Sequence, residues 1–509
     1  MSRAKRTGGL VAAGFLLIGM TALAAPGDLD PSFSDDGKQI TDIEGGPDRG
    51  FGLAPQANGR IVVVGDSRSE SGTEGNKFLT LRYQSNGALD EDFSDDGFDT
   101  KQIGDPISPA SSATAAVLQP GGKIVVAGQA FNAQGNNDFA VIRYLANGTM
   151  DTSFGDNGIR LVDFNGGGDR PVGMALQSTG KIVIAGNTGD GDDIGNFAVA
   201  RLTPDGTLDK SFTGDGTTTI DFPSSSTFDM AAALAVDSDD KIVMVGHVDV
   251  PPPASANDGP LGSAIRQSAV ARLNPDGSPD SSFGDGGRVV LIVSETEEDE
   301  AYAVTVDHSG RILVSGRVDF AGYIARLRND GVLHSSFGIN GVMMLPTQEG
   351  TRGLAMQVDG KIIAAGNVFP DNLVVSRLKP DGSIDSSFGS AGHATVTQIA
   401  FATNIDLRID KANKIVVAAT ATSGASDVAV IRFLSGLPPN CSLAGDASGN
   451  VLVGGAGRDY ICGLAGKDRL NGKAGKDTLV GGPGADVLIG GPGDDTCLGG
   501  PGKDETINC

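Results

Sequence analysis

The sequence predicts an all-β protein, a seven-bladed β-propeller followed by a short parallel β-roll. Two internal repeats predict this fold. A long repeat of roughly 59 residues fills most of the 509-residue chain, and a short repeat of nine residues lies at the C-terminus. A third observation agrees with them: short β-rich runs and Asn-Gly or Asp-Gly turns recur, whereas almost no segment has the spacing of a long amphipathic helix.

The first 24 residues are expected to be a secretory signal peptide. Arg3, Lys5 and Arg6 precede an apolar run from Leu10 to Ala24. A run of about fifteen residues is shorter than the roughly twenty that a membrane-spanning helix needs, and the small residues around Ala24 suit cleavage there. We therefore expect residues 1–24 to be removed and the mature protein to be secreted and extracellular.

Three sequence marks occur seven times each after this leader. The first has the form LDxSF, the second resembles GKIVVAG, and the third, of the type AVARL, carries an arginine. The LDxSF marks end at Phe33, Phe93, Phe154, Phe212, Phe283, Phe337 and Phe388. The arginines of the third mark are Arg82, Arg143, Arg201, Arg272, Arg326, Arg377 and Arg432.

One unit shows why the repeat predicts strands. An apolar segment from Ala113 to Leu118 is followed by a turn at Gln119 to Gly122, a β-rich run from Lys123 to Ala127, a loop, and the run from Phe139 to Leu145. Units of four short strands at this period are typical of β-propeller blades. The marks resemble the delta-60 repeat family, and the resemblance covers nearly everything from residue 26 to 437.

The order of the marks predicts a closed ring. The chain starts with LDxSF, which is the end of a unit, and the repeats finish at Ala429 to Phe433, the strand that should pair with it. An open array would leave both half-units as bare edges. We therefore expect a seven-bladed propeller over residues 26–437, with the segment around Phe33 beside Arg432.

The repeated arginine is expected to be structural. A desolvated guanidinium needs a partner, and a carboxylate can accept two of its hydrogen bonds. Six of the seven LDxSF marks offer an aspartate for this purpose, whereas His334 takes its place in one blade. The six are Asp30, Asp90, Asp151, Asp209, Asp280 and Asp385.

The C-terminal repeat has the form GGxGxDxUx, where U is aliphatic. The segment from Gly481 to Ile489 is its clearest copy. Glycines suit turns with positive φ, and the aliphatic residues suit a thin core. Turn carbonyls beside a carboxylate are the oxygen ligands that a hard cation such as calcium accepts. The aspartates that recur are Asp459, Asp468, Asp477, Asp486, Asp495 and Asp504.

This pattern resembles the RTX, or haemolysin-type, calcium-binding repeat, which places a Ca²⁺-binding β-roll at residues 438–509. The resemblance implies two repeats per turn, so aspartates eighteen residues apart stack into two columns with four inter-turn sites. Asn450 extends the second column, and Leu464 and Lys473 depart from the pattern where the second glycine is missing. The glycines expected to form the metal sites with the six aspartates are Gly481, Gly482, Gly484, Gly490, Gly491 and Gly493.

All four cysteines lie in this C-terminal region. An even number in an exported domain with a small core indicates two disulfides, although four cysteines allow three connectivities. We favour the two local pairs, Cys441 with Cys462 and Cys497 with Cys509, because each would hold one end of the roll.

The composition argues against several functions. A formal net charge of −24 repels nucleic acid and anionic membranes. The four histidines are scattered without HExxH spacing, so we predict no catalytic residues and no organic cofactor. The chain has no Trp and only five Tyr, which disfavours a carbohydrate-binding groove. An acidic loop with Asp190, Asp192 and Asp193 offers a further cation site but lacks EF-hand spacing.

The expected function is that of a secreted, non-enzymatic, calcium-binding scaffold. Propeller function usually lies on the loops of one rim. The variable connection between the second and third marks is longest between His247 and Ser268, around Pro251 to Pro253, and we expect it to contact an unidentified extracellular protein or polysaccharide. The alternative is an extracellular hydrolase or lyase, which convergent, unpaired carboxylates in the central funnel would favour.

Overall fold

The computed structural model describes residues 25–70, 75–105, 110–190, 193–222, 228–250, 265–294, 297–307, 309–346, 348–399, 405–421, 426–436, 441–445, 449–464, 466–482, 484–500 and 502–509. The predicted signal peptide, the predicted boundary between residues 437 and 438, and Pro251 to Pro253 lie outside these ranges. Apart from the 3₁₀ turn η1 (Pro120–Gly122), the described chain is all-β, as predicted. None of its helical segments is long and apolar enough to cross a membrane.

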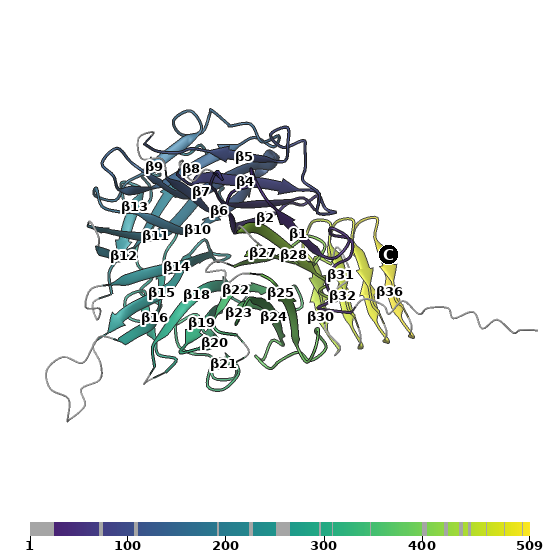
Figure 1. Cartoon of the computed structure of the whole chain (residues 1–509). Helices are drawn as coiled ribbons and strands as arrows, with labels where there is room; N and C mark the ends of the chain where they lie inside the picture. Colours follow the sequence, from purple (N-terminus) through teal and green to yellow (C-terminus); the bar gives the residue numbers. More distant parts are fainter. Residues whose placement is uncertain are drawn as a thin grey trace, which may run out of the picture.

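Seven four-stranded antiparallel sheets form the blades of a propeller. Figure 1 shows them as a ring whose colours run from purple to green. Blade 1 contains β2 (Asp48–Pro55), β3 (Ile61–Ser67), β4 (Lys77–Tyr83) and β5 (Phe98–Lys101). Blade 2 contains β6 (Ser111–Gln119), β7 (Lys123–Phe131), β8 (Asn137–Tyr144) and β9 (Ile159–Val162). Blade 3 contains β10 (Arg170–Leu176), β11 (Ile182–Asp190), β12 (Asp193–Leu202) and β13 (Thr217–Ile220).

The remaining blades repeat this order. Blade 4 contains β14 (Asp229–Val236), β15 (Ile242–Val250), β16 (Ile265–Leu273) and β17 (Arg288–Leu291). Blade 5 contains β18 (Asp299–Val306), β19 (Ile312–Val318), β20 (Ala321–Leu327) and β21 (Val342–Leu345). Blade 6 contains β22 (Thr351–Met356), β23 (Ile362–Val368), β24 (Asn372–Leu378) and β25 (His393–Thr397).

Blade 7 is built from both ends of the repeat region. It contains β26 (Asp406–Ile409), β27 (Ile415–Ala421), β28 (Asp427–Phe433) and the N-terminal β1 (Lys38–Thr41), which pairs antiparallel with β28. Leu29 also forms a bridge with Phe433, and the Arg432 guanidinium lies 4.7 Å from the centre of the Phe33 ring. The predicted closure of the ring is therefore confirmed.

The core lies between the blades. The first strand of each blade contacts the first strands of its neighbours around the centre of the ring. The second and third strands are sandwiched between blades, so most of their residues are buried instead of alternating between buried and exposed; every residue of β3, for example, is buried. One apolar cluster joins Leu53 and Leu79 of blade 1 to Val416 and Val430 of blade 7, which seals the junction where the chain closes.

The repeated arginines are structural, as predicted. In six blades the arginine forms an ion pair of 2.5–2.9 Å with the LDxSF aspartate. All seven guanidinium groups stack 4.4–4.9 Å from the centre of the LDxSF phenylalanine ring. The arginine also donates to a carbonyl of the next blade, as Arg143 does to Pro204 at 2.6 Å. Each arginine thus joins two blades.

In five of these pairs the pKa of the aspartate is lowered, so the carboxylate stays ionised. Burial raises the pKa of Asp209, but hydrogen bonds from Lys181 and Ser211 and the charge of Arg201 outweigh it and hold that pKa well below its usual range. Blade 5 differs because His334 replaces the aspartate. The buried Nε of Arg326 has no hydrogen-bond partner there among the described residues, and burial lowers the pKa of its guanidinium.

The C-terminal strands form a parallel solenoid, drawn in yellow in Figure 1. One sheet contains β29 (Leu443–Ala444), β31 (Tyr460–Cys462), β33 (Thr478–Val480) and β35 (Thr496–Leu498). The other contains β30 (Val451–Val453), β32 (Arg469–Asn471), β34 (Val487–Ile489) and β36 (Glu505–Ile507). The aliphatic U positions fill the thin core between the sheets, as predicted, with fully buried Ile461, Leu470, Leu479 and Leu488.

The solenoid begins against the propeller. Cys441, Ala444 and Cys462 form a small buried cluster against which Val358 of blade 6 packs. Asn413 of blade 7 donates from its side chain to the carbonyl of Cys441 at 3.5 Å. The first turn is thus anchored on the propeller, and the later turns stack outward from it (Figure 1).

Candidate metal centre

The solenoid strands place the aspartates of the nine-residue repeat in two columns. Tyr460, Thr478 and Thr496 pair in register, so the aspartates that precede them stack. The backbone N–H of Asp459 donates to Oδ1 of Asp477 at 2.8 Å, and that of Asp477 donates to Oδ1 of Asp495 at 2.8 Å. Each carboxylate is therefore fixed by the turn before it.

The second column repeats this geometry. The backbone N–H of Asp468 donates to Oδ1 of Asp486 at 2.8 Å, and that of Asp486 donates to Oδ1 of Asp504 at 3.0 Å. The N–H of Asn450 donates to Oδ1 of Asp468 at 2.8 Å, so Asn450 does extend this column. The four aspartate-to-aspartate contacts of the two columns coincide with the four inter-turn positions that the sequence predicted.

The other carboxylate oxygen points into a cradle made by glycine. Oδ2 is buried and accepts no hydrogen bond from the described residues in Asp477, Asp486 and Asp495. A Cβ at Gly481 would lie 2.5 Å from Oδ2 of Asp486 and 2.5 Å from the carbonyl oxygen of Gly499. A Cβ at Gly490 would lie 2.6 Å from Oδ2 of Asp495. In the Gly-Gly pair that opens each of these repeats, the first glycine therefore leaves room beside a carboxylate oxygen that accepts no hydrogen bond from the described residues.

The remaining predicted glycines bring carbonyl oxygens to the same edges. A Cβ at Gly482 or Gly484 would collide with the carbonyl of Leu464 or Gly466, one turn earlier. Gly491 and Gly493 stand in the same relation to Lys473 and Gly475. The carbonyl oxygens of one turn thus lie against the glycines of the next turn, beside the carboxylates.

The two departures from the repeat leave the turn intact. Leu464 and Lys473 occupy the position of the second glycine and adopt φ of 71° and 75°. This left-handed conformation disfavours residues with a Cβ. Gly482 and Gly491, one turn later, have φ of 97° and 107° at the same position. The backbone path is therefore kept, with strain at the two substituted turns.

The donor set of these edges consists of carboxylate and carbonyl oxygens. Flexible coordination by six to eight such oxygens is what calcium accepts, whereas zinc and copper prefer His or Cys. The four cysteines of this region are all in disulfides. The residues present therefore fit calcium: the six aspartates would supply carboxylate oxygens, and the glycine-rich turns would supply carbonyls.

Comparison with protein-family models agrees with this chemistry. The model of the RTX calcium-binding nonapeptide repeat matches residues 444–479 and 471–505. The model described as a domain of unknown function (DUF5122) beta-propeller matches residues 56–93, 119–154, 177–212, 262–283 and 357–388. The chain combines DUF5122 β-propeller repeats with RTX calcium-binding repeats. The two family resemblances noted in the sequence are thus confirmed.

Comparison with solved structures found similarities at low identity. Virginiamycin B lyase from Staphylococcus aureus is 9% identical, with a TM-score of 0.45 over 77% of this chain and 98% of that one. Drosophila Plexin A is 10% identical, with a TM-score of 0.42 over 81% and 88%. Aldose sugar dehydrogenase from Streptomyces coelicolor is 12% identical, with a TM-score of 0.35 over 78% and 98%. No curated protein matches the sequence. These similarities are too distant to carry a functional argument.

Two disulfides lie at the ends of the RTX solenoid. Cys441 bonds Cys462 and Cys497 bonds Cys509, so the two local pairs are confirmed over the other connectivities. The first pair lies where the solenoid meets the propeller. The second ties the last residue of the chain to β35. An RTX array this short has few turns to share its strain, so covalent ties at its ends oppose fraying.

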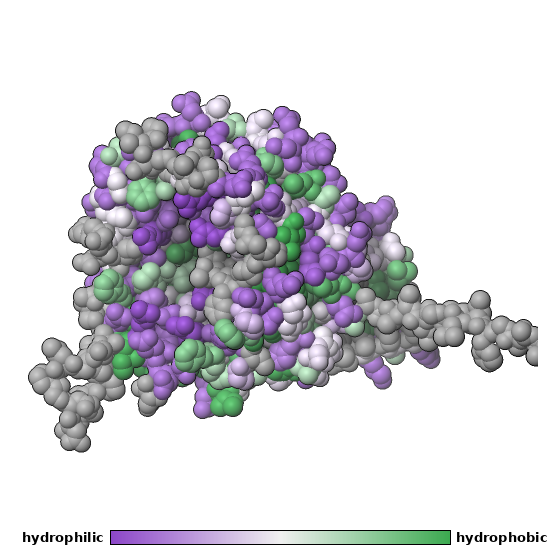
Figure 2. Space-filling model, in the orientation of Figure 1, coloured by the Kyte–Doolittle hydropathy of each residue, from purple (hydrophilic) through white to green (hydrophobic). Residues whose placement is uncertain are grey.

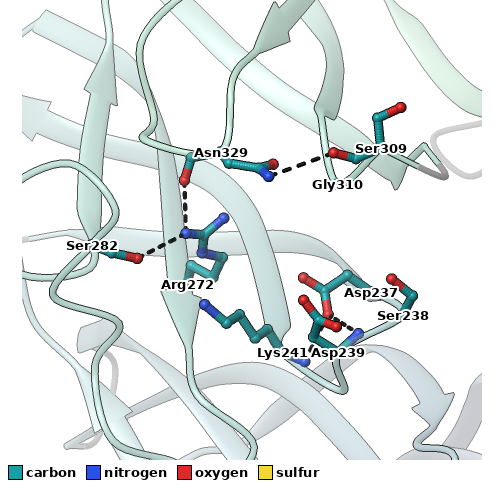
Figure 3. A pocket seen from close by; sticks show the side chains of 9 residues that line it. All are labelled: Asp237, Ser238, Asp239, Lys241, Arg272, Ser282, Ser309, Gly310 and Asn329. Carbon is teal, nitrogen blue, oxygen red and sulfur yellow. Dashed lines mark hydrogen bonds between the residues drawn. The ribbon is translucent and has the colours of Figure 1, made fainter.

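A pocket of about 390 Å³ opens between blades 4 and 5 of the DUF5122 propeller. Figure 3 shows Arg272 at its wall, hydrogen-bonded to Ser282 and to the carbonyl of Asn329. The second cation of the pocket, Lys241, contacts Asp280 at 2.7 Å, as Arg272 also does. Both charges are therefore already engaged in the structural ion pairs of the repeat.

Two carboxylates on the innermost strands, Glu300 and Asp406, are also engaged in ion pairs. Glu300 of β18 pairs with Arg266 at 2.7 Å and with Arg317 at 3.4 Å, and it accepts a hydrogen bond from Tyr302. Asp406 of β26 pairs with Arg408 at 3.3 Å. These two therefore differ from the unpaired funnel carboxylates that would favour a hydrolase or lyase.

Two clusters of carboxylates at blade junctions were not predicted from the sequence. Asp42, Asp48 and Asp427 bring one carboxylate oxygen each within 4.8 Å of one another, and so do Asp138, Asp163 and Asp169. A sequence signal for them exists, because DIEGGPD at 42–48 and DFNGGGD at 163–169 share the pattern D-x-x-G-G-x-D. The predicted acidic loop is not among these clusters, and the side chains of Asp190, Asp192 and Asp193 lie outside the described residues.

Proposed function

We propose that this protein is a secreted, non-enzymatic, calcium-binding scaffold whose C-terminal solenoid folds around calcium and whose propeller rim contacts another molecule. One observation carries the calcium part. The buried Oδ2 atoms of Asp477, Asp486 and Asp495 accept no hydrogen bond from the described residues, although each side chain is fixed through Oδ1. A divalent cation on each edge would neutralise such stacked carboxylates.

Calcium would act in this scaffold as a structural ion. The solenoid core has four fully buried aliphatic side chains, which offset little of the entropy lost when the chain is ordered. Repulsion between stacked carboxylates opposes folding further. Extracellular modules bind calcium at about 10⁻⁴–10⁻³ M, near the calcium concentration outside cells, so calcium binding and solenoid folding become one event there.

The two disulfides support the proposed extracellular location. Disulfides form and persist in oxidising compartments, and small domains with thin cores rely on them. The thin RTX solenoid fits that description because it holds all four cysteines of the chain. The apolar N-terminal segment with its basic start supports the same proposal from the sequence.

Exposed aromatic side chains indicate which rim of the propeller contacts the partner in this proposal. It is the rim that carries the loops between the second and third strands. Phe320 lies between β19 and β20 and is 76% exposed, and Phe369 lies between β23 and β24 and is 71% exposed. They occupy equivalent loops of neighbouring blades. Most of the visible face in Figure 2 is hydrophilic, with scattered apolar residues. Exposed aromatics on such a surface are suited to anchor a partner.

Calcium removal from the full-length protein tests this proposal. Circular dichroism and limited proteolysis would be followed while calcium is chelated and then restored. We expect cleavage sites to appear between residues 441 and 509 on chelation, while the propeller remains protected. Restored calcium should reverse the change, and the same concentration of magnesium should not. A solenoid that resists protease equally with and without calcium would contradict the proposal.

The scaffold role needs a separate test. The double variant Phe320→Ala and Phe369→Ala removes the exposed rings, and Ile339→Ala, at an 80% exposed site outside those loops, is the control. Binding to a panel of extracellular matrix and cell-surface polymers should fall in the double variant only. Turnover of a glycan by the wild-type protein would instead favour the hydrolase or lyase alternative.

A further inference from the structure

We propose that the propeller itself binds two calcium ions, one at the junction of blades 7 and 1 and one at the junction of blades 2 and 3, each held by three aspartates from two adjacent blades. These sites are separate from the RTX repeats. They would fasten the same blades together at the opposite ends of strands β8 and β28 from Arg143 and Arg432.

At the junction of blades 2 and 3, three strands end at one point. Asp138 lies at the start of β8, Asp163 directly follows β9, and Asp169 directly precedes β10. Asp169 is fully buried, and its Oδ2 accepts the backbone N–H of Phe164 at 2.8 Å. Its Oδ1 has no hydrogen-bond partner among the described residues. A buried carboxylate oxygen beside two further carboxylates and without a donor is suited to bind a cation.

The junction of blades 7 and 1 repeats the arrangement atom by atom. Asp427 starts β28, Asp42 directly follows β1, and Asp48 starts β2. Asp48 is fully buried, its Oδ2 accepts the N–H of Ile43 at 2.5 Å, and its Oδ1 has no partner among the described residues. The N–H of Asp48 donates to the carbonyl of Ser426 at 2.6 Å, just as that of Asp169 donates to Asn137 at 2.6 Å.

The two connecting loops also match. Oδ1 of Asp42 accepts the N–H of Gly45 at 2.9 Å, and Oδ1 of Asp163 accepts the N–H of Gly166 at 2.7 Å. The residues before these glycines, Glu44 and Asn165, have φ of 60° and 62°. The same loop is thus built twice, at junctions two blades apart.

A hydroxyl accompanies the three carboxylates at both junctions. Ser67 pairs with Asp48 across β3 and β2, and Thr188 holds the same position in β11. Both are buried. In the other five blades this position is apolar, occupied by Ala130, Val248, Val318, Val368 and Ala421. A hydroxyl therefore accompanies the three carboxylates at these two junctions, and an apolar side chain takes the place of the hydroxyl in the other five blades.

Charge and ligand type favour calcium as the occupant. None of the six carboxylates takes part in an ion pair with the lysines and arginines that the structure describes. At each junction three carboxylate oxygens lie within 4.8 Å of one another, so a single cation can contact all three. Oxygen-only ligands of this kind are those that calcium accepts.

The exposed aspartates give a test that leaves the buried core intact. Full-length protein would carry Asp42→Asn and Asp163→Asn together, and Asp221→Asn would be the matched control. Asp221 directly follows β13 at the junction of blades 3 and 4, where Asn196 stands in the position of Asp138. Bound calcium would be counted by equilibrium dialysis, and the propeller melting transition would be followed by calorimetry with and without calcium.

We expect the double variant to bind two fewer calcium ions than the wild-type protein and to lose the rise in propeller melting temperature that calcium produces. The control should keep both. The single variants should each lose one ion. An unchanged ion count in the double variant would overturn the proposal, and so would an equal rise in melting temperature with magnesium. Because solenoid protection from protease is read separately, failure of these sites is distinguishable from failure of the RTX sites.

Discussion

The propeller and the solenoid both repeat an aspartate at a fixed period, but they balance its charge differently. In the propeller, Asp209 contacts Arg201 at 2.8 Å and Lys181 at 2.9 Å. The LDxSF aspartates of five other blades are likewise paired with the repeated arginine. In the solenoid, Asp477 is 1% exposed and takes part in no ion pair within the described residues. A repeat that carries its own counter-ion should fold without metal, whereas a repeat that lacks one should depend on cations from the medium.

The hydrophobic cores of the propeller and the solenoid also differ in size. Each propeller junction buries a large apolar cluster, such as the one that runs from Val62 to Ile142 across blades 1 and 2. Within the described residues, the solenoid core has only four fully buried aliphatic side chains, two from each sheet. The part of the molecule that we propose to depend on calcium is therefore also the part with the smallest hydrophobic stabilisation. We expect the two regions to fail under different conditions.

The largest effect is expected from removing one internal counter-ion. Asp385→Ala leaves the buried Arg377 guanidinium without its carboxylate and should destabilise the propeller by about 3–5 kcal/mol. Calorimetry of the propeller transition measures this loss. Asp371→Ala, at a half-buried carboxylate of the same blade that forms no ion pair within the described residues, is the control and should have little effect. An unchanged propeller melting temperature in the first variant would show that the pair is not structural.

A smaller effect is expected from one solenoid carboxylate. Asp477→Asn keeps the shape but removes a charge from the buried column, so half-folding of the solenoid should need about tenfold more calcium, or about 1.4 kcal/mol. Circular dichroism during a calcium titration of the full-length chain measures it. Asp494→Asn, at a neighbouring exposed site outside the columns, should leave the midpoint in place. Equal midpoints in all three proteins would rule out Asp477 as a ligand.

The smallest effect tests the one blade that lacks a counter-ion. His334→Asp supplies a carboxylate to the buried Nε of Arg326 and should stabilise the propeller by about 1–2 kcal/mol. Chemical denaturation measures the gain. The same substitution beside Arg326→Met should give no gain, because the carboxylate then has no guanidinium to meet. A gain that persists without Arg326 would assign the effect to another contact.

The number of repeats and their local geometry could be predicted from the sequence because every copy of a repeat carries the same residue pattern. Seven copies of LDxSF gave seven blades, and the nine-residue period gave the two aspartate columns. The strand limits were less accurate: the predicted Ala113 to Leu118 is β6, Ser111–Gln119. Strand ends depend on the partner strand, here β7, which extends to Phe131 through pairs that the sequence pattern does not mark.

The junction carboxylates escaped prediction for a different reason. The D-x-x-G-G-x-D loop occurs at only two of seven junctions, so a search for features shared by all units passes over it. Its third ligand candidate is also distant in sequence, since Asp427 joins Asp42 and Asp48 only when the ring closes.

By itself the sequence determined the number of repeats, the oxygen-only character of the solenoid edges and the pairing of arginine with aspartate, because these follow from periodic spacing along one strand or turn. The tertiary structure alone decided which charges remain unbalanced. Whether a carboxylate meets a cation depends on the register between neighbouring blades and turns. That register leaves Oδ1 of Asp48 and Asp169 buried without a donor in the described structure, while it gives Asp30 an arginine from the far end of the repeat region.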